Sequence, residues 1–170
     1  MRRPSDCRSL FKSLAHAGMI ALVLTTLAAC GPQRKSVFPP TVTIQRMRVE
    51  ANGTWQLTLR IQNNSYGGMH FTALDGTLAM TGSVPLRLHR DFALDIPAFA
   101  GDVLPLDVLP TPQMSAALAA IAKQGSAGQL GYRIDGSVTA QPEQENAPRP
   151  FPMHGEGWLS PVPGIPDTYR

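Results

Sequence analysis

The sequence predicts an all-β domain, an antiparallel β-sandwich of about seven strands with one short helix. Short runs in which apolar and polar residues alternate recur from residue 41 onward, and turn residues separate them at near-regular spacing. Only residues 111–125 have apolar side chains at helical spacing instead. Hydrophobic residues make up 43% of the 170-residue chain, which is enough for the core of one domain.

The first 29 residues have the pattern of a secretory signal peptide and are excluded from the fold. Four basic residues and one acidic residue precede an apolar stretch of about 16 residues, shorter than the ~20 residues of a spanning helix. The stretch ends in Leu27-Ala28-Ala29-Cys30, which resembles a bacterial lipobox. We therefore expect cleavage before Cys30 and a lipid on its thiol. An ordinary signal peptide with an incidental cysteine is the alternative.

The residue after the cysteine is Gly31 rather than aspartate, which resembles the signal for outer-membrane sorting in Gram-negative bacteria. We expect a lipid-anchored protein of the bacterial envelope, at the outer membrane and facing the periplasm. The membrane is then a partner through Cys30. The chain's other cysteine, Cys7, lies in the signal peptide, so we expect no internal disulfide.

The charge distribution argues against a nucleic-acid partner. The whole chain has a formal net charge of +3 and a pI near 9.2, which alone would suggest nucleic-acid binding. The excess positive charge belongs to the signal peptide, and residues 30–170 contain equal numbers of basic and acidic residues. We therefore expect no nucleic acid among the partners.

Composition sets the expected domain boundaries. Residues 30–40 include "GPQRKSVFPP", which lacks periodicity and is expected to form a lipidated tether. The β-domain is expected to span residues 41–160. Residues 161–170, "PVPGIPDTYR", are too rich in proline to continue a sheet and are expected to be an extended or disordered tail.

The first two strands are expected to form a hairpin. Residues 41–50 alternate but change phase between Ile44 and Met47, which predicts a bulge or twist. Asn52-Gly53 then supplies the strongest short hairpin signal, because both residues tolerate positive φ. The second strand has one apolar face, formed by Trp55, Leu57, Leu59 and Ile61.

Five more strand patterns follow. In the third of them Pro105 favours an edge position or a bulge. A polar, proline-rich loop is expected at residues 142–152, between the last two strands. The five patterns are residues 69–82, 84–97, 102–109, 130–140 (with Tyr132, Ile134 and Val138 alternating) and 151–160.

One segment predicts a helix. Thr111 suits the N-cap and Pro112 the first helical position, while Lys123 and Gly125 stand at the far end. Its apolar face docks on the β-domain and gives no reason to expect a cofactor site. The face consists of Met114, Ala117, Leu118 and Ile121.

No catalytic arrangement stands out. The histidines after Cys30 fall on different predicted strands, and His154 has no second metal ligand at a useful spacing. The aspartates are spread out, and no serine has a nucleophile-elbow context. We therefore expect no catalytic residue, no metal and no cofactor. The residues considered are His70, His89, His154, Asp91, Asp95, Asp102, Asp107, Ser65, Ser83, Ser115 and Ser126.

Six short motifs follow one another in a family-like order. They are Ile61-Gln62-Asn63-Asn64-Ser65, Leu74-Asp75-Gly76-Thr77-Leu78, Pro97-Ala98-Phe99-Ala100-Gly101, Gly125 after the helix, Tyr132-Arg133-Ile134-Asp135-Gly136, and Pro150-Phe151 through Gly155. Over about residues 42–159 the chain thereby resembles the WHy (water stress and hypersensitive response) domain of late embryogenesis abundant (LEA) type 2 proteins. One departure is Asn64, where the family turn usually has proline.

The resemblance implies an immunoglobulin-like or fibronectin-III-like sandwich without catalytic residues. Asn63 is expected to satisfy backbone groups of a turn, and the strand glycines to mark bulges or close strand approach. The positions with expected structural roles are Asn63, Asn64, Gly76, Gly101, Gly125, Tyr132 and Gly136.

The expected function is a non-catalytic role of a lipid-anchored domain, either protection during desiccation or osmotic stress or protein interaction. The partners would be client proteins or an envelope protein. A binding subunit of an envelope assembly, pairing through an edge strand, is one alternative, and an exposed apolar groove would favour it. A carrier or sensor of a small amphiphile is another, favoured by unfilled apolar volume inside the domain.

Overall fold

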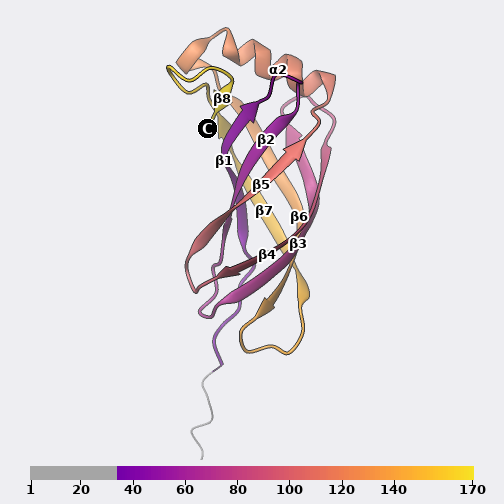
Figure 1. The fold of residues 1–170 in the computed structure, drawn as a ribbon, viewed down its shortest axis with the longest axis vertical. Coiled ribbons are helices and arrows are strands. Elements are labelled where there is room, and N and C mark those ends of the chain that lie inside the picture. The colour runs from indigo at the N-terminus through magenta and orange to yellow at the C-terminus, as the bar shows by residue number, and fades with distance from the viewer. Residues whose placement is uncertain (1–33) are drawn as a thin grey trace, which may run out of the picture. The chain divides into compact units, whose positions relative to one another are not determined.

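The computed structural model describes residues 34–170, so the predicted signal peptide, Cys30 and residues 31–33 lie outside the described residues. Residues 35–170 form one unit of eight strands and one α-helix, which confirms the all-β class (Figure 1). The elements are β1 Thr41–Val49, β2 Trp55–Gln62, β3 Met69–Met80, β4 Leu86–Ile96, β5 Gly101–Val108, α2 Pro112–Ala122, the 3₁₀ turn η1 Gly125–Ala127, β6 Leu130–Pro142, β7 Arg149–Leu159 and β8 Thr168–Tyr169.

The first hairpin is confirmed, including its irregularity. β1 and β2 pair antiparallel, and the register shifts between Ile44 and Arg46, so Gln45 is the extra residue of a bulge. Gly53 in the connecting turn has φ +84°, a conformation that favours glycine. The alternation also holds, because the side chains of Trp55, Leu57, Leu59 and Ile61 are all buried.

The strands join into one mixed sheet with the order β4-β3-β6-β7-β1-β2-β5, and β8 pairs with β1. Every pairing is antiparallel except that of β1 with β7, which runs parallel and has a single register pair, Thr41 with His154. The sheet nearly closes on itself around the core. β5 is an end strand, so Pro105 lies on an edge as expected.

Two predicted glycines stand face to face in the sheet. Gly76 of β3 pairs directly with Gly136 of β6. A Cβ on Gly136 would lie 2.3 Å from the carbonyl oxygen of Asp75, and one on Gly76 would lie 2.7 Å from that of Asp135. The pair therefore marks a close approach of two strands, while the register shift of β3 lies elsewhere, between Phe71 and Ala73.

The helix begins and ends where the sequence predicts. Thr111 accepts a hydrogen bond from the backbone N–H of Met114 at 3.3 Å, and Pro112 is the first helical residue. Lys123 is the C-cap, and Gly125 follows with φ +60°. α2 lies across one end of the strands, beside the C-terminal residues (Figure 1), and its side chains buried against the core are Met114, Leu118 and Ile121. Among residues 34–170, no helix is both long and apolar enough to cross a bilayer.

The predicted tail is wrong in one respect, because the chain returns to the sheet. Thr168 and Tyr169 form β8 and pair antiparallel with Arg48 and Met47 of β1. Their side chains are buried. The prolines are confined to residues 161–166, where they form the return, so they do not prevent the residues after them from pairing.

The expected loop at residues 142–152 is shorter than predicted. β6 continues to Pro142 and β7 already begins at Arg149, so Pro150 and Pro152 lie within a strand. They pair with β6 only, since β7 meets β1 at His154 and not before. This part of β7 is therefore an edge, where the missing proline N–H leaves no gap in a ladder.

Candidate functional site

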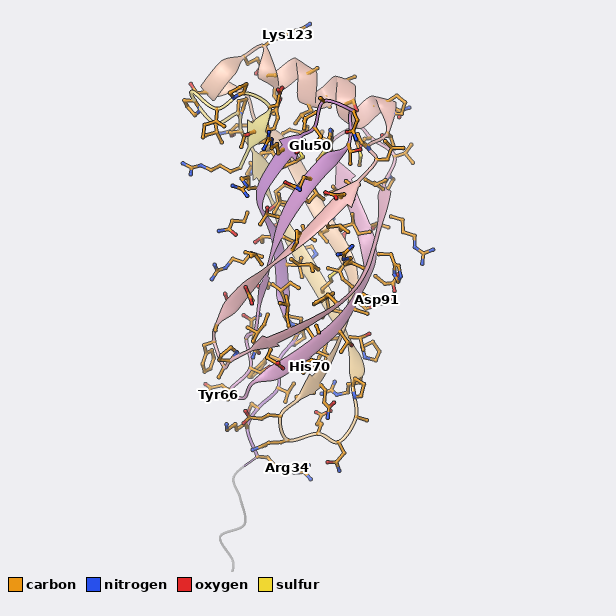
Figure 2. The ribbon with its side chains drawn as sticks, viewed as in Figure 1. Arg34, Glu50, Tyr66, His70, Asp91 and Lys123 are labelled. Atoms are coloured by element: carbon orange, nitrogen blue, oxygen red, sulfur yellow. The ribbon has the colours of Figure 1, made fainter. Side chains whose placement is uncertain are left out.

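Four connecting segments meet at one end of the strands, which we call the Lys35 end. They are residues 35–40, the turn 63–68, the turn 97–100 and the loop 143–148. Backbone hydrogen bonds join them: Tyr66 donates to Ser36 at 3.0 Å, Asn63 to Ala100 at 2.9 Å, and Glu143 to Gly68 at 3.0 Å. Tyr66 and His70 lie toward this end, whereas Lys123 lies at the opposite end, the α2 end (Figure 2).

Residues 35–40 belong to the folded unit, although their composition predicts a tether. The Phe38 N–H donates to the Ser65 hydroxyl at 2.9 Å, and Val37 packs partly buried against the core. Pro40 is buried. The segment has no periodicity because its contacts are made with loops and not with a neighbouring strand, so pattern analysis does not detect them.

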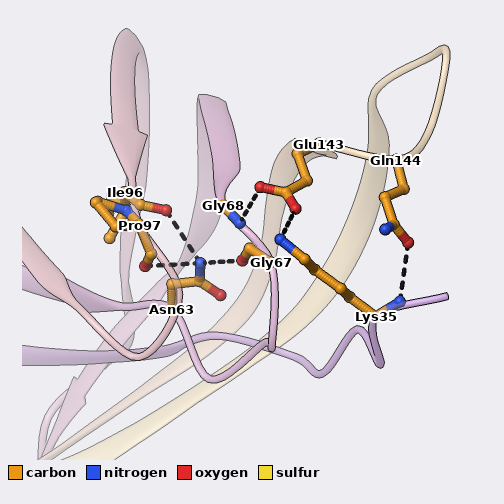
Figure 3. A network of polar contacts seen from close by, with 8 residues as sticks. All are labelled: Lys35, Asn63, Gly67, Gly68, Ile96, Pro97, Glu143 and Gln144. Carbon is orange, nitrogen blue, oxygen red and sulfur yellow. Dashed lines mark hydrogen bonds and ion pairs between the residues drawn. The ribbon is translucent and has the colours of Figure 1, made fainter. Parts of the chain in front are cut away.

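The side chain of Asn63 connects two turns of the Lys35 end (Figure 3). It is fully buried, and its amide nitrogen donates to the carbonyl oxygens of Gly67 at 2.9 Å, Ile96 at 3.0 Å and Pro97 at 3.0 Å. Its carbonyl oxygen accepts from the Ser65 N–H at 2.9 Å. The amide thereby supplements the backbone hydrogen bond from the Asn63 N–H to Ala100 and gives partners to further carbonyl groups of the two turns.

A second polar group fixes the first described residues to the loop 143–148. The Glu143 carboxylate forms an ion pair with the Lys35 ammonium group and accepts from the Gly68 N–H at 2.9 Å (Figure 3). The Lys35 N–H donates to the Gln144 side chain at 2.9 Å. The hydrogen bond from Lys35, followed by that from Gly68, lowers the pKa of Glu143 below its ordinary value. Both charged groups are half exposed, so the pair positions the segment more than it stabilises the fold.

Three aromatic side chains are exposed together at this end. Phe38 is 46% exposed, and Tyr66 and Phe99 are each 58% exposed. The ring centroids of Phe38 and Tyr66 lie 6.3 Å apart, and those of Tyr66 and Phe99 lie 4.8 Å apart in an edge-to-face arrangement. We call these three residues the aromatic cluster. Aromatic side chains held against one another in solvent form a surface suited to an apolar partner.

Phe99 occupies a conformation that is unusual for its residue type. The Ala100 N–H donates to the Pro97 carbonyl at 3.2 Å, which closes a turn, and Phe99 is the third residue of that turn with φ +56°. This turn position ordinarily favours glycine or asparagine. A bulky residue there costs about 1–3 kcal/mol. The fold tolerates this strain at Phe99 although the ring is exposed and is not needed to fill the core.

A polar rim borders the cluster. The Gln62 side-chain amide donates to the Phe99 carbonyl at 2.9 Å, and the Arg60 guanidinium donates to the Gln62 side-chain oxygen at 3.2 Å. Arg60 is exposed. A hollow of about 470 Å³ also opens at this end, and its lining includes Met69, His70, Asp95, Ile96 and Pro97.

Each histidine of the described residues faces an aspartate on the neighbouring strand. The Nδ1 to carboxylate distances are 2.7 Å for His70 with Asp95, 3.0 Å for His89 with Asp75, and 2.7 Å for His154 with Asp135. The Arg87 and His89 hydrogen bonds lower the pKa of Asp75. These are surface cross-strand pairs, and residues 34–170 contain no group of three His, Cys, Asp or Glu side chains that could hold a metal ion.

The structure brings together only part of the residues singled out in the sequence. Asn63, Asn64 and Gly101 lie at the Lys35 end, where Asn64 donates to the Pro39 carbonyl at 2.9 Å. Gly76 and Gly136 lie within the sheet, Gly125 follows α2, and Cys30 lies outside the described residues. Tyr132 is buried, and its hydroxyl accepts from the Ile44 N–H at 3.0 Å.

The aromatic cluster and the Lys35–Glu143 pair were not predicted from the sequence. Their members come from separate segments, with Lys35 and Glu143 108 positions apart. One local signal was available, since Phe99 stands in the Pro97–Gly101 motif at a turn position where a bulky aromatic is unexpected.

The α2 end carries other exposed apolar side chains. Leu109 lies two positions before the helix cap Thr111, Trp158 stands in β7 opposite Gly131, and Ile165 lies in the C-terminal return, where it lines a hollow together with Ala122. Their exposed fractions are 73% for Leu109, 66% for Trp158 and 55% for Ile165. Exposed apolar side chains therefore occur at both ends of the domain.

Comparisons with known proteins give no family. No family model matches the chain, and no curated protein matches it. A solved target of the Northeast Structural Genomics Consortium is 11% identical, with a TM-score of 0.46 over 76% of this chain and 92% of that chain. A solved protein from Archaeoglobus fulgidus is 10% identical, with a TM-score of 0.39 over 75% of this chain and 100% of that chain. Likenesses at this level carry no argument about function.

Proposed function

We propose that the chain is a lipid-anchored protein of the bacterial cell envelope whose β-domain binds other proteins and performs no chemistry of its own. Its place would be the periplasmic face of the outer membrane. The observation that carries this proposal is the separation of the two ends of the domain. Lys35 lies five positions after Cys30 in the sequence, and the exposed side chains of Leu109, Trp158 and Ile165 belong to segments at the other end, the α2 end.

The reach of the chain supports a defined attachment. Five residues span at most about 18 Å when fully extended. A lipid on Cys30 would therefore keep Lys35 close to the membrane, and the contacts of Lys35 with Glu143 and Gln144 would transmit that restraint to the domain. The α2 end would then be the end that meets proteins of the periplasm.

The surface of the α2 end suits partly unfolded clients. Leu109, Trp158 and Ile165 are each more than half exposed. Exposed apolar surface on a folded domain can cover the apolar segments through which unfolding proteins aggregate. Protection of clients during desiccation or osmotic stress is the form of this role that the WHy-like motif order suggests.

The finer fold assignment belongs to the same proposal. We assign residues 41–160 to the WHy type, with an immunoglobulin-like or fibronectin-III-like sandwich as its architecture. Support comes from the order of the six motifs and from Asn63, whose side chain forms two hydrogen bonds within its own turn and two more with Ile96 and Pro97.

Two alternatives have weaker support. Pairing of a partner with the edge strand β5 would make the protein a subunit of an envelope assembly, and Val103 on this strand is 40% exposed. Pro105 interrupts that edge, however. A carrier of a small amphiphile would need unfilled interior volume, whereas the hollows lined by Met69, Tyr132 or Ile165 open to solvent.

The anchor is tested with the full chain expressed in a Gram-negative host. We expect the wild type to fractionate with membranes and to have the mass of a chain cleaved before Cys30 and acylated. Cys30→Ser should remain an uncleaved precursor or be mislocalised, because a hydroxyl is too weak a nucleophile to replace the thiolate. Equal fractionation and masses without lipid in both proteins would overturn the anchor.

The binding role is tested with the purified lipidated chain in liposomes. A labile enzyme is taken through freeze–thaw or drying at increasing ratios of the protein, and its aggregation is measured against empty liposomes. We expect stoichiometric protection that Trp158→Ser with Leu109→Ser weakens and that Val103→Ser, the matched control, leaves unchanged. Protection no better than that of an unrelated β-sandwich at equal mass would remove the client-binding role.

A further inference from the structure

We propose that the aromatic cluster, Phe38, Tyr66 and Phe99, inserts into the interfacial layer of the phospholipid bilayer to which the chain is anchored. The inference rests on the lipid anchor of the proposed function and deepens it: the Lys35 end would be seated on the membrane surface and not merely tethered near it. The occupant of the cluster is then a lipid surface.

The chemistry of the cluster fits the boundary between headgroups and acyl chains. Aromatic side chains concentrate at this boundary, where an apolar ring is buried and a polar tip stays hydrated. Tyr66, in the middle of the cluster, offers such a hydroxyl, while Phe38 and Phe99 are wholly apolar. The Tyr66 ring lies against both Phe38 and Phe99, so the three rings would enter as one patch.

Two charged groups at the Lys35 end, Glu143 and Arg60, also fit a phospholipid surface. Glu143, which would be repelled by phosphate groups, is paired with Lys35 and bound to the Gly68 N–H. The exposed guanidinium of Arg60 is linked through Gln62 to the backbone of Phe99. When the exposed rings enter the bilayer, a guanidinium beside them is placed to contact a lipid phosphate.

The support beneath the cluster is rigid. The buried Asn63 amide joins the turn that carries Tyr66 to the turn that carries Phe99. Phe99 keeps its exposed ring at φ +56°, where glycine would be free of strain. Strain that persists in an ordered turn and serves to expose an apolar side chain indicates a role for that side chain.

The chain length selects the membrane over other occupants. Phe38 follows Cys30 by eight positions, a reach of at most about 29 Å. A lipid at Cys30 would confine the cluster to a thin layer beside the bilayer, where the cost in entropy of docking is already reduced. A second copy of the chain or a client protein would have to reach the cluster through that same layer.

The test uses the lipidated full-length product in liposomes of phosphatidylethanolamine and phosphatidylglycerol. Phe99→Cys carries an environment-sensitive fluorophore, and Val84→Cys, which is 61% exposed in the β3–β4 turn, carries it in the matched control. Quenching is measured with a nitroxide placed high on a lipid acyl chain and with iodide in the buffer. Intact mass reports the lipid on Cys30, and melting curves report folding of each variant.

We expect the label at position 99 to be quenched several-fold more by the lipid-borne nitroxide than the label at position 84, and less by iodide. In the Phe99→Cys background, Tyr66→Ser should remove most of that difference, whereas Leu109→Ser should leave it.

Equal quenching at both positions in a chain that carries the lipid would overturn the docking and leave the anchor intact. A shielded label at position 99 that the lipid-borne nitroxide does not quench would indicate a protein occupant and would also overturn it. A chain whose mass shows no lipid would overturn both proposals.

Discussion

The backbone N–H of Ile44 donates a hydrogen bond to the hydroxyl of Tyr132 at 3.0 Å, from β1 across β7 to β6. The bond lies next to the bulge at Gln45, where β1 and β7 share only one register pair, Thr41 with His154. Gly157 provides the passage, since a Cβ there would lie 2.8 Å from the Tyr132 hydroxyl oxygen. The Tyr132 side chain thus supplies an acceptor for a backbone N–H of β1 where β1 and β7 have few register pairs.

Tyr132→Phe should destabilise the domain by about 1–3 kcal/mol, because it leaves the Ile44 N–H buried without an acceptor. The measurement is chemical denaturation at neutral pH. Tyr66→Phe is the control, since the Tyr66 ring is exposed and its loss of a hydroxyl should change little. Equal effects of the two substitutions would contradict the role of the bond.

The same tyrosine predicts sensitivity to alkali. Burial raises the pKa of Tyr132 above its ordinary value of 10.0, so the folded state keeps a proton that the unfolded state loses. This stabilisation is complete below pH 10.0 and is lost as the pH rises through the folded-state pKa. The melting temperature of the wild type should fall as the pH rises above 10.0, and that of Tyr132→Phe should fall less steeply. Burial also raises the pKa of Tyr169, so part of the fall should remain.

Asn63→Ala should be among the most destabilising polar substitutions in the described domain. It removes the donor to the carbonyls of Gly67 and Ile96 and the acceptor for the Ser65 N–H, whereas the Pro97 carbonyl keeps its bond from the Ala100 N–H. Each buried group left unpaired costs about 1–3 kcal/mol. Asn64→Ala loses one bond, to Pro39, at a half-exposed position and should cost no more than about 1 kcal/mol. Thermal denaturation compares the two, and a larger effect at Asn64 would refute this view of the turn.

Leu59→Ala should cost about 2–5 kcal/mol, because the Leu59 side chain is fully buried in the core. Thr58→Ala, one position away on the other face of β2, should do little. Urea denaturation of both variants measures the difference. If both lowered stability equally, the assignment of the inner face of β2 would be wrong.

Phe99→Gly should change the free energy of unfolding by between about −0.5 and about +2.5 kcal/mol, because two effects oppose each other. Relief of the positive φ favours the variant by about 1–3 kcal/mol, and loss of the edge-to-face contact with Tyr66 costs about 0.5–1.5 kcal/mol. The variant should nevertheless lose membrane docking. A fluorophore on another residue of the aromatic cluster would report this loss. A large loss of stability would mean that the ring serves the fold and not a surface.

The sequence by itself determined the local structure of this protein. The Asn52-Gly53 hairpin, the bulge in β1, the buried face of β2 and the capped helix α2 are set by residues adjacent or a few positions apart, and each appears as predicted. The turn role of Asn63 was also predicted from the sequence, because an asparagine side chain forms hydrogen bonds with backbone groups a few positions away. Such features depend on φ preferences and side-chain periodicity, which are properties of the local sequence and do not require distant contacts.

The tertiary structure decided which distant segments meet. The parallel contact of β1 with β7, the return of β8 to β1, the Lys35–Glu143 pair and the aromatic cluster all join residues that no short pattern connects. Phe38, Tyr66 and Phe99 come together because the three segments that carry them, residues 35–40, 63–68 and 97–100, all lie at the Lys35 end of the sheet. That convergence follows from strand order and register, and these are fixed only when the whole core closes.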